Sequence, residues 1–360
     1  MTDTSKDTLR GTVVNVASVA CTVDTPEGEL TCAARGRLTE RETDERNPVT
    51  VGDRVIVEKT DEGEGVVTER LPRRSRLVRT SPQNPRQKHV IVANLDQVVI
   101  VVAVRQPPLN VGIIDRYVIA ALYGGMEPVI CVNKIDLAGK EAEYEQVAEL
   151  YRDLDYPVVL TSAKTGEGLE DLKDKLAGKS SVFAGHSGVG KSSLLNAIQP
   201  GLELRTAPLG WKGKHCTSAV NLLKVGGDAY VADTPGIREL SPWDIDRHEV
   251  QQFFPEIWEK SSECKMPDCT HMHEPRCAVL EAVDEGEIDP RRYDSYTSIV
   301  ETVVQLTEPR ETDVEQPREQ VSQKKREPSR RTRKQKLEER FEEEIENYYR
   351  RRGDENDSAG

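Results

Sequence analysis

Hydrophobic and polar residues alternate in short runs over the first part of the chain. Residues typical of turns, such as Pro26, Gly28 and Gly63, separate these runs. Five short strands within residues 1–72 predict a small closed barrel of the OB type, although an SH3-like barrel would give almost the same pattern. The predicted strands are Thr12–Val16, Cys21–Val23, Leu30–Ala33, Arg54–Val57 and Gly65–Thr68.

From residue 90 to residue 241 the pattern changes to continuous apolar runs that alternate with helical stretches. Runs such as Gln97–Val104, Pro128–Val132 and Ser181–Ala184 are typical of strands that are buried on both faces. The alternation predicts a parallel sheet with crossover helices. Residues 73–89, which come before it, are expected to be a basic linker.

The last part of the chain divides into two segments of different composition. Residues 242–306 contain a cluster of cysteines followed by helical stretches, and we expect a separate helical domain there. Residues 307–360 are almost wholly charged and polar. Because such a composition buries too little apolar surface to fold, we expect a largely disordered tail.

The charge is unevenly distributed. The formal net charge of −13 argues against a polyanionic partner for the chain as a whole. However, the basic segment from Arg70 to Lys88 contains no acidic residue, and a second basic run spans residues 324–336. These segments are either solvated surface or contacts for nucleic-acid phosphates.

The composition also indicates the compartment. The first ten residues lack the apolar core of a signal peptide, and the chain has no run of about 18 apolar residues. Seven cysteines, an odd number, argue against a disulfide framework. We therefore expect a cytoplasmic monomer without a membrane partner.

Residues 185–192 match the phosphate-loop pattern. The segment reads Gly185-His186-Ser187-Gly188-Val189-Gly190-Lys191-Ser192 and lies between an apolar strand and a helix. Its glycines let backbone N–H groups surround phosphate oxygens at a helix N-terminus. Lys191 is expected to contact the β- and γ-phosphates and to act in catalysis, the Ser192 hydroxyl to bind Mg²⁺, and Ser193 to complete the loop.

Two segments that follow strands are candidates for binding the base. In Asn133-Lys134-Ile135-Asp136, the carboxylate accepts the ring N–H and the exocyclic amine of guanine, which adenine does not offer together. In Thr161-Ser162-Ala163-Lys164, Ser162 and Ala163 are expected to contact the base. Each segment alone is a weak signal, and Asp136 would also serve as a helix N-cap. Together with the phosphate loop they predict a GTP site.

The γ-phosphate side of the site is predicted from two further segments. In Asp233-Thr234-Pro235-Gly236, Asp233 is expected to hold Mg²⁺ through a water, and the Gly236 amide to contact the γ-phosphate. The segment Gly213–Ser218 is either a first switch, in which Thr217 contacts Mg²⁺ and the γ-phosphate with Ser218 nearby, or a plain surface loop.

The group that activates water is less well defined. Ile237 occupies the position where signalling GTPases have a water-orienting glutamine, and an aliphatic side chain cannot orient water. The imidazole of His215 is suited to this role, but it equally fits a contact with solvent or a partner.

The order of the motifs is unusual. The base motif at residues 133–136 precedes the phosphate loop at residues 185–192, whereas ordinary GTPases have the phosphate loop first. We therefore interpret residues 90–241 as a circularly permuted P-loop GTPase domain of the α/β class.

The cysteine cluster has the spacing of a metal site. Cys264-x4-Cys269-x-His271-x5-Cys277 supplies three thiolates and one imidazole, a complete tetrahedral set for one structural Zn²⁺. His273 is an alternative nitrogen ligand, and free core cysteines are an alternative interpretation of the cluster.

These features together resemble the ribosome small-subunit-dependent GTPase A family, also called RsgA or YjeQ. The resemblance covers roughly residues 9–306 and includes Ala93–Gln97, Asp115–Tyr117, the permuted motifs and the cysteine spacing. It implies an OB barrel, a permuted GTPase domain and a zinc-bearing C-terminal domain, and it favours His271 over His273. The family's first switch reads Gly-Arg-His-Thr-Thr-Thr or close to it, of which Thr217 retains the middle threonine.

The resemblance also implies a function. It implies a role in late maturation of the small ribosomal subunit, with GTP hydrolysis stimulated by that subunit. We expect hydrolysis to be coupled to release of the protein from the subunit, and the partners to be the subunit and its rRNA. The alternatives are a zinc- and OB-containing GTPase switch in another RNA process, an RNA-binding protein without enzymatic activity, and an ATP hydrolase, which Asp136 disfavours.

Overall fold

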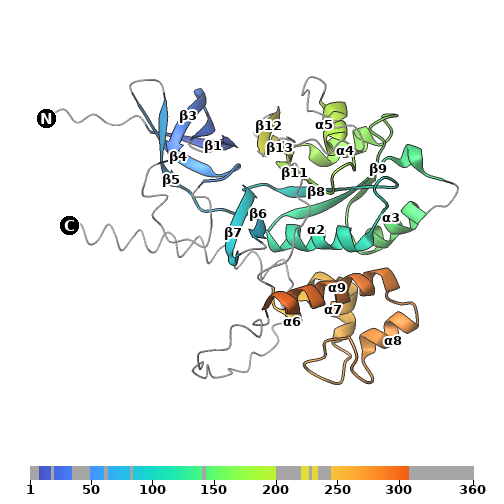
Figure 1. Ribbon diagram of the computed structural model, residues 1–360. Helices are drawn as coiled ribbons and strands as arrows, with labels where there is room; N and C mark the ends of the chain where they lie inside the picture. Colours follow the sequence, from blue (N-terminus) through green and yellow to red (C-terminus); the bar gives the residue numbers. More distant parts are fainter. Residues whose placement is uncertain are drawn as a thin grey trace, which may run out of the picture. The chain divides into compact units, whose positions relative to one another are not determined.

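The computed structural model describes residues 8–17, 20–34, 49–60, 64–81, 84–139, 143–199, 220–226, 229–233 and 245–307. Contacts group the chain into two units, residues 1–242 and 243–360, whose elements are labelled in Figure 1. The expected tail lies outside the described residues from residue 308 onward.

The amino-terminal strands close into a barrel, as the alternating pattern predicts. They pair in the order β1-β2-β3-β5-β4, with β4 pairing back to β1. The β3–β5 pair is parallel, which is the order and closure of an OB barrel. Val13, Val23, Val55 and Val57 are among the buried side chains that fill it. The strands are β1 (Thr8–Val16), β2 (Cys21–Thr25), β3 (Gly28–Ala34), β4 (Arg54–Lys59) and β5 (Gly65–Arg70).

A hairpin occupies most of the segment that was expected to be a linker. Strands β6 (Arg76–Ser81) and β7 (Asn84–Ala93) are antiparallel. Leu77 and Val92 are fully buried in the large apolar cluster that also contains the next strand of the chain. The basic residues around these apolar positions obscured the alternation, so the linker expectation was wrong over this hairpin.

The second sheet region is built from six strands in the order β10-β9-β8-β11-β13-β12. Neighbouring strands from β10 to β13 are parallel, and β12 is antiparallel to β13. Asn15 of β1 pairs with Asn221 of β12, so the barrel strands continue the sheet. Strand β12 was not predicted. The strands are β8 (Gln97–Ala103), β9 (Glu127–Asn133), β10 (Val158–Leu160), β11 (Ser181–Ala184), β12 (Asn221–Gly226) and β13 (Ala229–Asp233).

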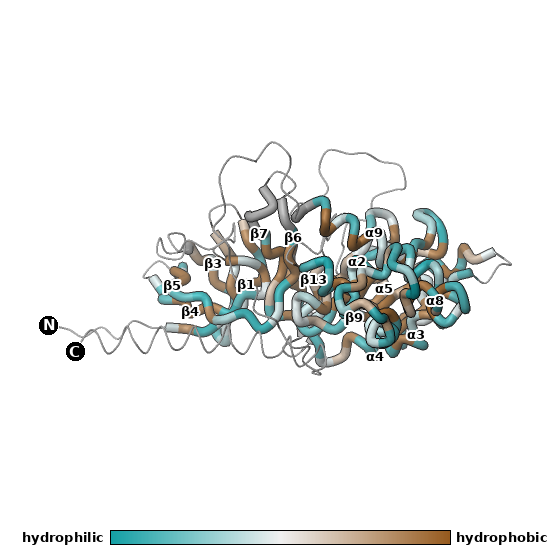
Figure 2. The backbone as a smooth tube through the Cα atoms, turned by 90° about the horizontal axis from the view of Figure 1, so that it is seen from below, coloured by the Kyte–Doolittle hydropathy of each residue, from teal (hydrophilic) through white to brown (hydrophobic). Residues whose placement is uncertain are grey.

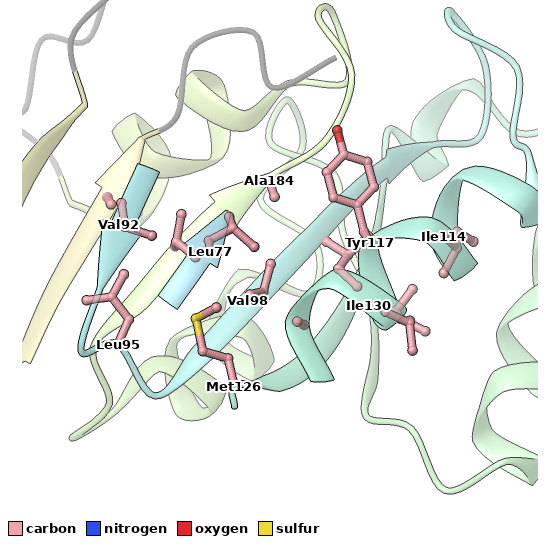
Figure 3. Packing of buried hydrophobic residues seen from close by; sticks show 14 of the residues in the cluster. Leu77, Val92, Leu95, Val98, Ile114, Tyr117, Met126, Ile130 and Ala184 are labelled. Carbon is pink, nitrogen blue, oxygen red and sulfur yellow. The ribbon is translucent and has the colours of Figure 1, made fainter. Parts of the chain in front are cut away.

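Helices cover both faces of this sheet. On β8, Val98, Ile100 and Val102 belong to a cluster with residues of α2 and α3, of which Figure 3 labels Val98 and, on α2, Ile114 and Tyr117. Val99 and Val101 pack with α4 and α5 on the other face. Burial on both faces explains the continuous apolar run of this strand. The helical elements are α2 (Val111–Tyr123), η1 (Ile135–Leu137), α3 (Glu143–Asp153), α4 (Leu169–Leu176) and α5 (Lys191–Ile198).

The strand order accounts for the permuted motifs. If the strands are renumbered from β11, which leads into the phosphate loop, the sheet order reads 6-5-4-1-3-2. The short segment 177–180 connects α4 to β11, and it thereby joins the last strand of the renumbered order to the first. The chain thus enters this sheet at the fourth strand of the order that begins with the phosphate loop.

The second unit is helical. Its elements pack around Phe254, Ile257 and Tyr296, which are buried. The buried Arg292 forms two hydrogen bonds with Glu256, at 2.7 and 3.2 Å, and its guanidinium lies 4.4 Å from the centre of the Phe254 ring. These elements are α6 (Arg247–Val250), η2 (Gln251–Phe253), α7 (Pro255–Ser261), α8 (Ala278–Asp284) and α9 (Pro290–Thr307).

The helices are amphipathic rather than uniformly apolar. Figure 2 shows hydrophilic and hydrophobic residues within single helices, as expected for elements buried on one side. Among the helices that the structure describes, none is long and apolar enough to cross a membrane.

Candidate nucleotide site and metal centre

The phosphate loop is pressed against the neighbouring strands. A Cβ on Gly185, at φ 145°, would lie 2.2 Å from the carbonyl oxygen of Val101. A Cβ on Gly190, at φ 99°, would lie 2.4 Å from Nδ2 of Asn133. Both positions therefore need glycine, for space and for backbone conformation.

Lys191 is folded onto the loop. Its Nζ donates to the carbonyl oxygen of Gly185 at 2.8 Å and to that of His186 at 3.1 Å, and the side chain is buried. The ammonium group is therefore held against the backbone that surrounds the expected phosphate position.

Asn133 connects the phosphate loop to the base segments. Its Nδ2 donates to the carbonyl oxygen of Val189 at 2.9 Å. Its Oδ1 accepts from the Ala163 amide at 3.2 Å and from the Thr161 hydroxyl at 3.3 Å. The side chain is 1% exposed, so these contacts are made in place of water.

Asp136 and Lys134, in the same segment as Asn133, also contact the neighbouring segments. Asp136 Oδ1 accepts from the Ser162 hydroxyl at 2.7 Å, and Lys164 Nζ lies 3.7 Å from Oδ2. Lys134 donates from Nζ to the carbonyl oxygens of Gln106 and Gly188, each at 2.6 Å. Burial lowers the pKa of Lys134, while the charge of Asp136 opposes that shift.

The predicted residues therefore meet at one edge of the sheet, where the carboxyl ends of β9, β10 and β11 lie together. This is the usual ligand position in open α/β sheets. The residues at this edge are Asn133, Lys134, Asp136, Ser162, Ala163, Gly185, His186, Ser187, Gly188, Val189, Gly190, Lys191, Ser192 and Ser193.

The γ-phosphate side is described only in part. His215, Thr217 and Gly236 lie outside the described residues, as does the side chain of Asp233. The backbone of Asp233 ends β13 and pairs with Phe183 of β11, the strand that leads into the phosphate loop.

The four predicted metal ligands converge in the second unit. The ligand atoms of Cys264, Cys269, His271 and Cys277 all lie within 4.8 Å of one another. Nδ1 of His271 is 3.5 Å from Cys264 Sγ and 3.4 Å from Cys277 Sγ, and these two sulfur atoms are 3.8 Å apart. His273 is exposed and does not belong to the group. Such a group could hold one metal ion.

Neighbouring residues fix the histidine. Its Nε2 hydrogen-bonds to Gln251 Oε1 at 2.7 Å, and the Tyr293 hydroxyl donates to its carbonyl oxygen at 2.7 Å. The Gln251 contact leaves Nδ1 directed at the thiols. Outer contacts of this kind orient metal-binding histidines.

Glu274 organises the turn between these ligands. Its carboxylate accepts from the amides of Thr270, Met272 and His273 and from the Thr270 hydroxyl. Burial alone would raise the pKa of Glu274, but these hydrogen bonds together hold it well below its usual range.

Comparison with known proteins identifies the family. The RsgA GTPase family model matches residues 70–243. The small ribosomal subunit biogenesis GTPase RsgA of Caldanaerobacter subterraneus subsp. tengcongensis is 41% identical over 298 residues, which cover 82% of this chain and 96% of that protein. The protein of the same name from Thermotoga maritima is 41% identical over 297 residues, or 81% and 95% of the two chains. This chain belongs to the RsgA GTPase family.

Solved structures agree with this assignment to the RsgA family. YjeQ from Thermotoga maritima gives a TM-score of 0.66 at 39% identity, over 83% of this chain and 99% of that one. YloQ, described as a circularly permuted GTPase, gives 0.64 at 32% identity, over 86% and 99%. The permuted α/β fold predicted from the motif order is therefore confirmed.

Two basic residues of this RsgA-family chain have structural partners. Arg73 is buried and bonded to Asp53, with Nε–Oδ1 at 2.6 Å and Nη2–Oδ2 at 2.7 Å. Arg74 pairs with Asp96 at 2.7 Å. Arg73 is therefore neither solvated surface nor available to phosphates, so neither of the two interpretations of the basic segment holds at this residue.

The sequence prediction missed three supporting residues, Gln106, Gln251 and Tyr117. Gln251 contacts the metal-ligand candidate His271 through its side-chain amide oxygen, and Gln106 contacts Lys134 of the nucleotide site through its backbone carbonyl. No sequence signal exists for either contact. Tyr117, by contrast, belongs to the segment Asp115–Tyr117 that resembles the RsgA family. Nothing in the sequence connected it to the phosphate loop, where its hydroxyl contacts the backbone of Gly185.

Proposed function

We propose that this RsgA-family protein hydrolyses GTP in late maturation of the small ribosomal subunit, with hydrolysis stimulated by the subunit and coupled to release from it. The proposal is supported by the joining of base and phosphate segments through Asn133. It is also supported by relatives that are named small ribosomal subunit biogenesis GTPases. Its partners would be the subunit with its rRNA, GTP and GDP.

In this proposal each segment has a separate task. The Asp136 carboxylate reads the guanine edge, and Ser162 holds that carboxylate in position. Lys191 moves from the loop carbonyls to the β- and γ-phosphates.

The γ-phosphate would be approached from the segments around His215 and Gly236. Ser192, Thr217 and Asp233 would hold Mg²⁺, which neutralises charge on the phosphates when it is bound. His215 would position the attacking water. Loss of the γ-phosphate would remove contacts of both segments and lower affinity for the subunit.

We propose that the cysteine–histidine group binds one structural Zn²⁺. Bonds of about 2.3 Å to sulfur and about 2.0 Å to nitrogen in a tetrahedron place sulfur atoms about 3.8 Å apart and sulfur about 3.5 Å from nitrogen. The separations among Cys264, His271 and Cys277, at 3.8, 3.5 and 3.4 Å, fit these values, and Cys269 Sγ lies within 4.8 Å of the other ligand atoms. All four ligands come from the protein, so the ion would stabilise the fold and take no part in hydrolysis.

The test is GTP hydrolysis measured with and without isolated small ribosomal subunits, for the wild type and for His215→Ala. We expect the subunit to raise the rate of phosphate release in the wild type, and His215→Ala to reduce that stimulated rate. Phosphate release that other RNA stimulates and the subunit does not would instead support the GTPase switch in another RNA process.

A further inference from the structure

The backbone of Gly185, the first residue of the phosphate loop, is held at three points. The Val101 carbonyl lies against its Cα, so that no Cβ fits. Lys191 Nζ donates to its carbonyl oxygen at 2.8 Å. Its amide donates to the hydroxyl oxygen of Tyr117. The third contact comes from α2, an element outside the nucleotide motifs.

Tyr117 is built to make this contact. Its side chain is 3% exposed and belongs to the apolar cluster on the α2 face of the sheet. Figure 3 shows the ring extending from α2 toward the end of β11, where Ala184 precedes the loop. Burial raises the pKa of Tyr117, so the hydroxyl remains neutral at physiological pH.

The helix that carries Tyr117 is itself fixed at its first turns. The Tyr151 hydroxyl of α3 donates to Asp115 Oδ1 at 2.5 Å and lies 3.2 Å from the carbonyl oxygen of Val111. Asn110 caps the helix by accepting from the Ile113 amide at 3.1 Å. Tyr117 therefore projects from a rigid support.

We propose that Tyr117 is a positioning residue, and that its hydroxyl on α2 anchors the first residue of the phosphate loop, Gly185. The proposal rests on the nucleotide site assigned under the proposed function. The Lys191 contact to Gly185 is given up when the ammonium turns to phosphate, whereas the Tyr117 contact does not compete with the ligand. The hydroxyl thus keeps the start of the loop in one conformation whether or not nucleotide is bound.

The decisive variant is Tyr117→Phe, which keeps the ring and removes the acceptor. Tyr230→Phe is the matched control, because it removes a hydroxyl of the same apolar cluster that donates to Asp24 of the barrel and takes no part in the support of α2. We expect Tyr117→Phe to raise the Kd of fluorescently labelled GDP roughly tenfold, since a buried amide is left without its acceptor. The KM for GTP should rise more than kcat falls.

The control separates positioning from general stability. Tyr230→Phe should lower the Tm, because Asp24 loses a donor, and leave the GDP Kd within about twofold of the wild type. Equal effects of the two substitutions on Kd, or an unchanged Kd in Tyr117→Phe, would overturn the proposal.

A measurement on the unaltered protein keeps the test independent of folding and of the proposed function. Without nucleotide, the Gly185 amide should exchange with solvent deuterium at least roughly a hundredfold more slowly than the Gly188 amide, which lies on the exposed part of the loop. Equal exchange rates would overturn the anchor. Failure of the wild type to bind GDP would instead contradict the nucleotide site, and the exchange result would still report on Tyr117.

Discussion

At the scale of single residues, the nucleotide site depends on side chains that make several contacts at once. Asn133 joins the carbonyl oxygen of Val189 to the amide of Ala163, so one side chain sets the spacing between the phosphate and base segments. Asp136 is held by the Ser162 hydroxyl through one oxygen. Because the Ser162 contact fixes the orientation of the Asp136 carboxylate, substitution of Asp136 tests base recognition directly.

We expect Asp136→Asn to shift the preference from GTP toward XTP. The amide NH2 of asparagine meets the exocyclic amine of guanine donor to donor, whereas it can donate to the 2-oxo group of xanthine, so GTP affinity should fall by about a hundredfold or more. Competition binding with GTP and XTP measures the change. Asp174→Asn on α4, an exposed aspartate, is the control and should keep the GTP preference. Unchanged selectivity in Asp136→Asn would refute the base assignment.

At the scale of elements, the sequence predicted a strand correctly where an apolar run was followed directly by a recognisable motif. Strand β11 and helix α5 lie where the apolar runs around the phosphate loop indicate. The β6–β7 hairpin was missed because its buried positions, such as Leu77 and Val92, stand among basic residues. Strand β12 was missed because it follows a segment without periodicity. The local pattern of hydrophobic and polar residues does not show which charged residue will pair with a buried residue of opposite charge.

Arg73 is a charged residue whose buried partner could not be predicted from the sequence. Its guanidinium and the Asp53 carboxylate are both almost completely buried, and the Thr50 amide also donates to Asp53, at 2.7 Å. We expect Arg73→Met to lower the free energy of unfolding by about 3–5 kcal/mol, because it leaves a buried carboxylate without its cation. Arg79→Met, at an exposed position of β6, should change it by less than about 0.5 kcal/mol. Urea unfolding measures both, and equal losses would contradict the structural role of Arg73.

At the scale of the whole molecule, the motif order and the sheet order describe the same permutation. The base motif comes first along the chain because β8, β9 and β10 precede β11. In the sheet, β8 lies beside β11, so the two halves of the site meet despite their order. Sequence order alone indicated the permutation, whereas the pairing of β1 with β12 that extends the sheet into the barrel required the structure.

The division into two units separates the predicted nucleotide residues from the predicted metal ligands. All predicted nucleotide residues lie within residues 1–242, and all four metal ligands lie within residues 243–360. Removing the metal leaves three cysteines and a histidine packed within 4.8 Å without the ion that would link them, and binding energy at such sites is folding energy. We therefore expect the loss of metal to unfold the second unit and to spare the first.

Chelation and Cys264→Ser test this expectation together. Each should remove about one equivalent of zinc and increase amide exchange across residues 245–307, because the second unit loses the ion that joins its four ligands. The Kd for GDP should stay within about twofold of the native value, whereas hydrolysis stimulated by the small subunit should be lost. Ser262→Ala, an exposed neighbour of the ligands, should retain the zinc. If chelation abolished GDP binding as well, the nucleotide site would depend on the second unit, and the first unit could not be the whole of the GTP-binding domain.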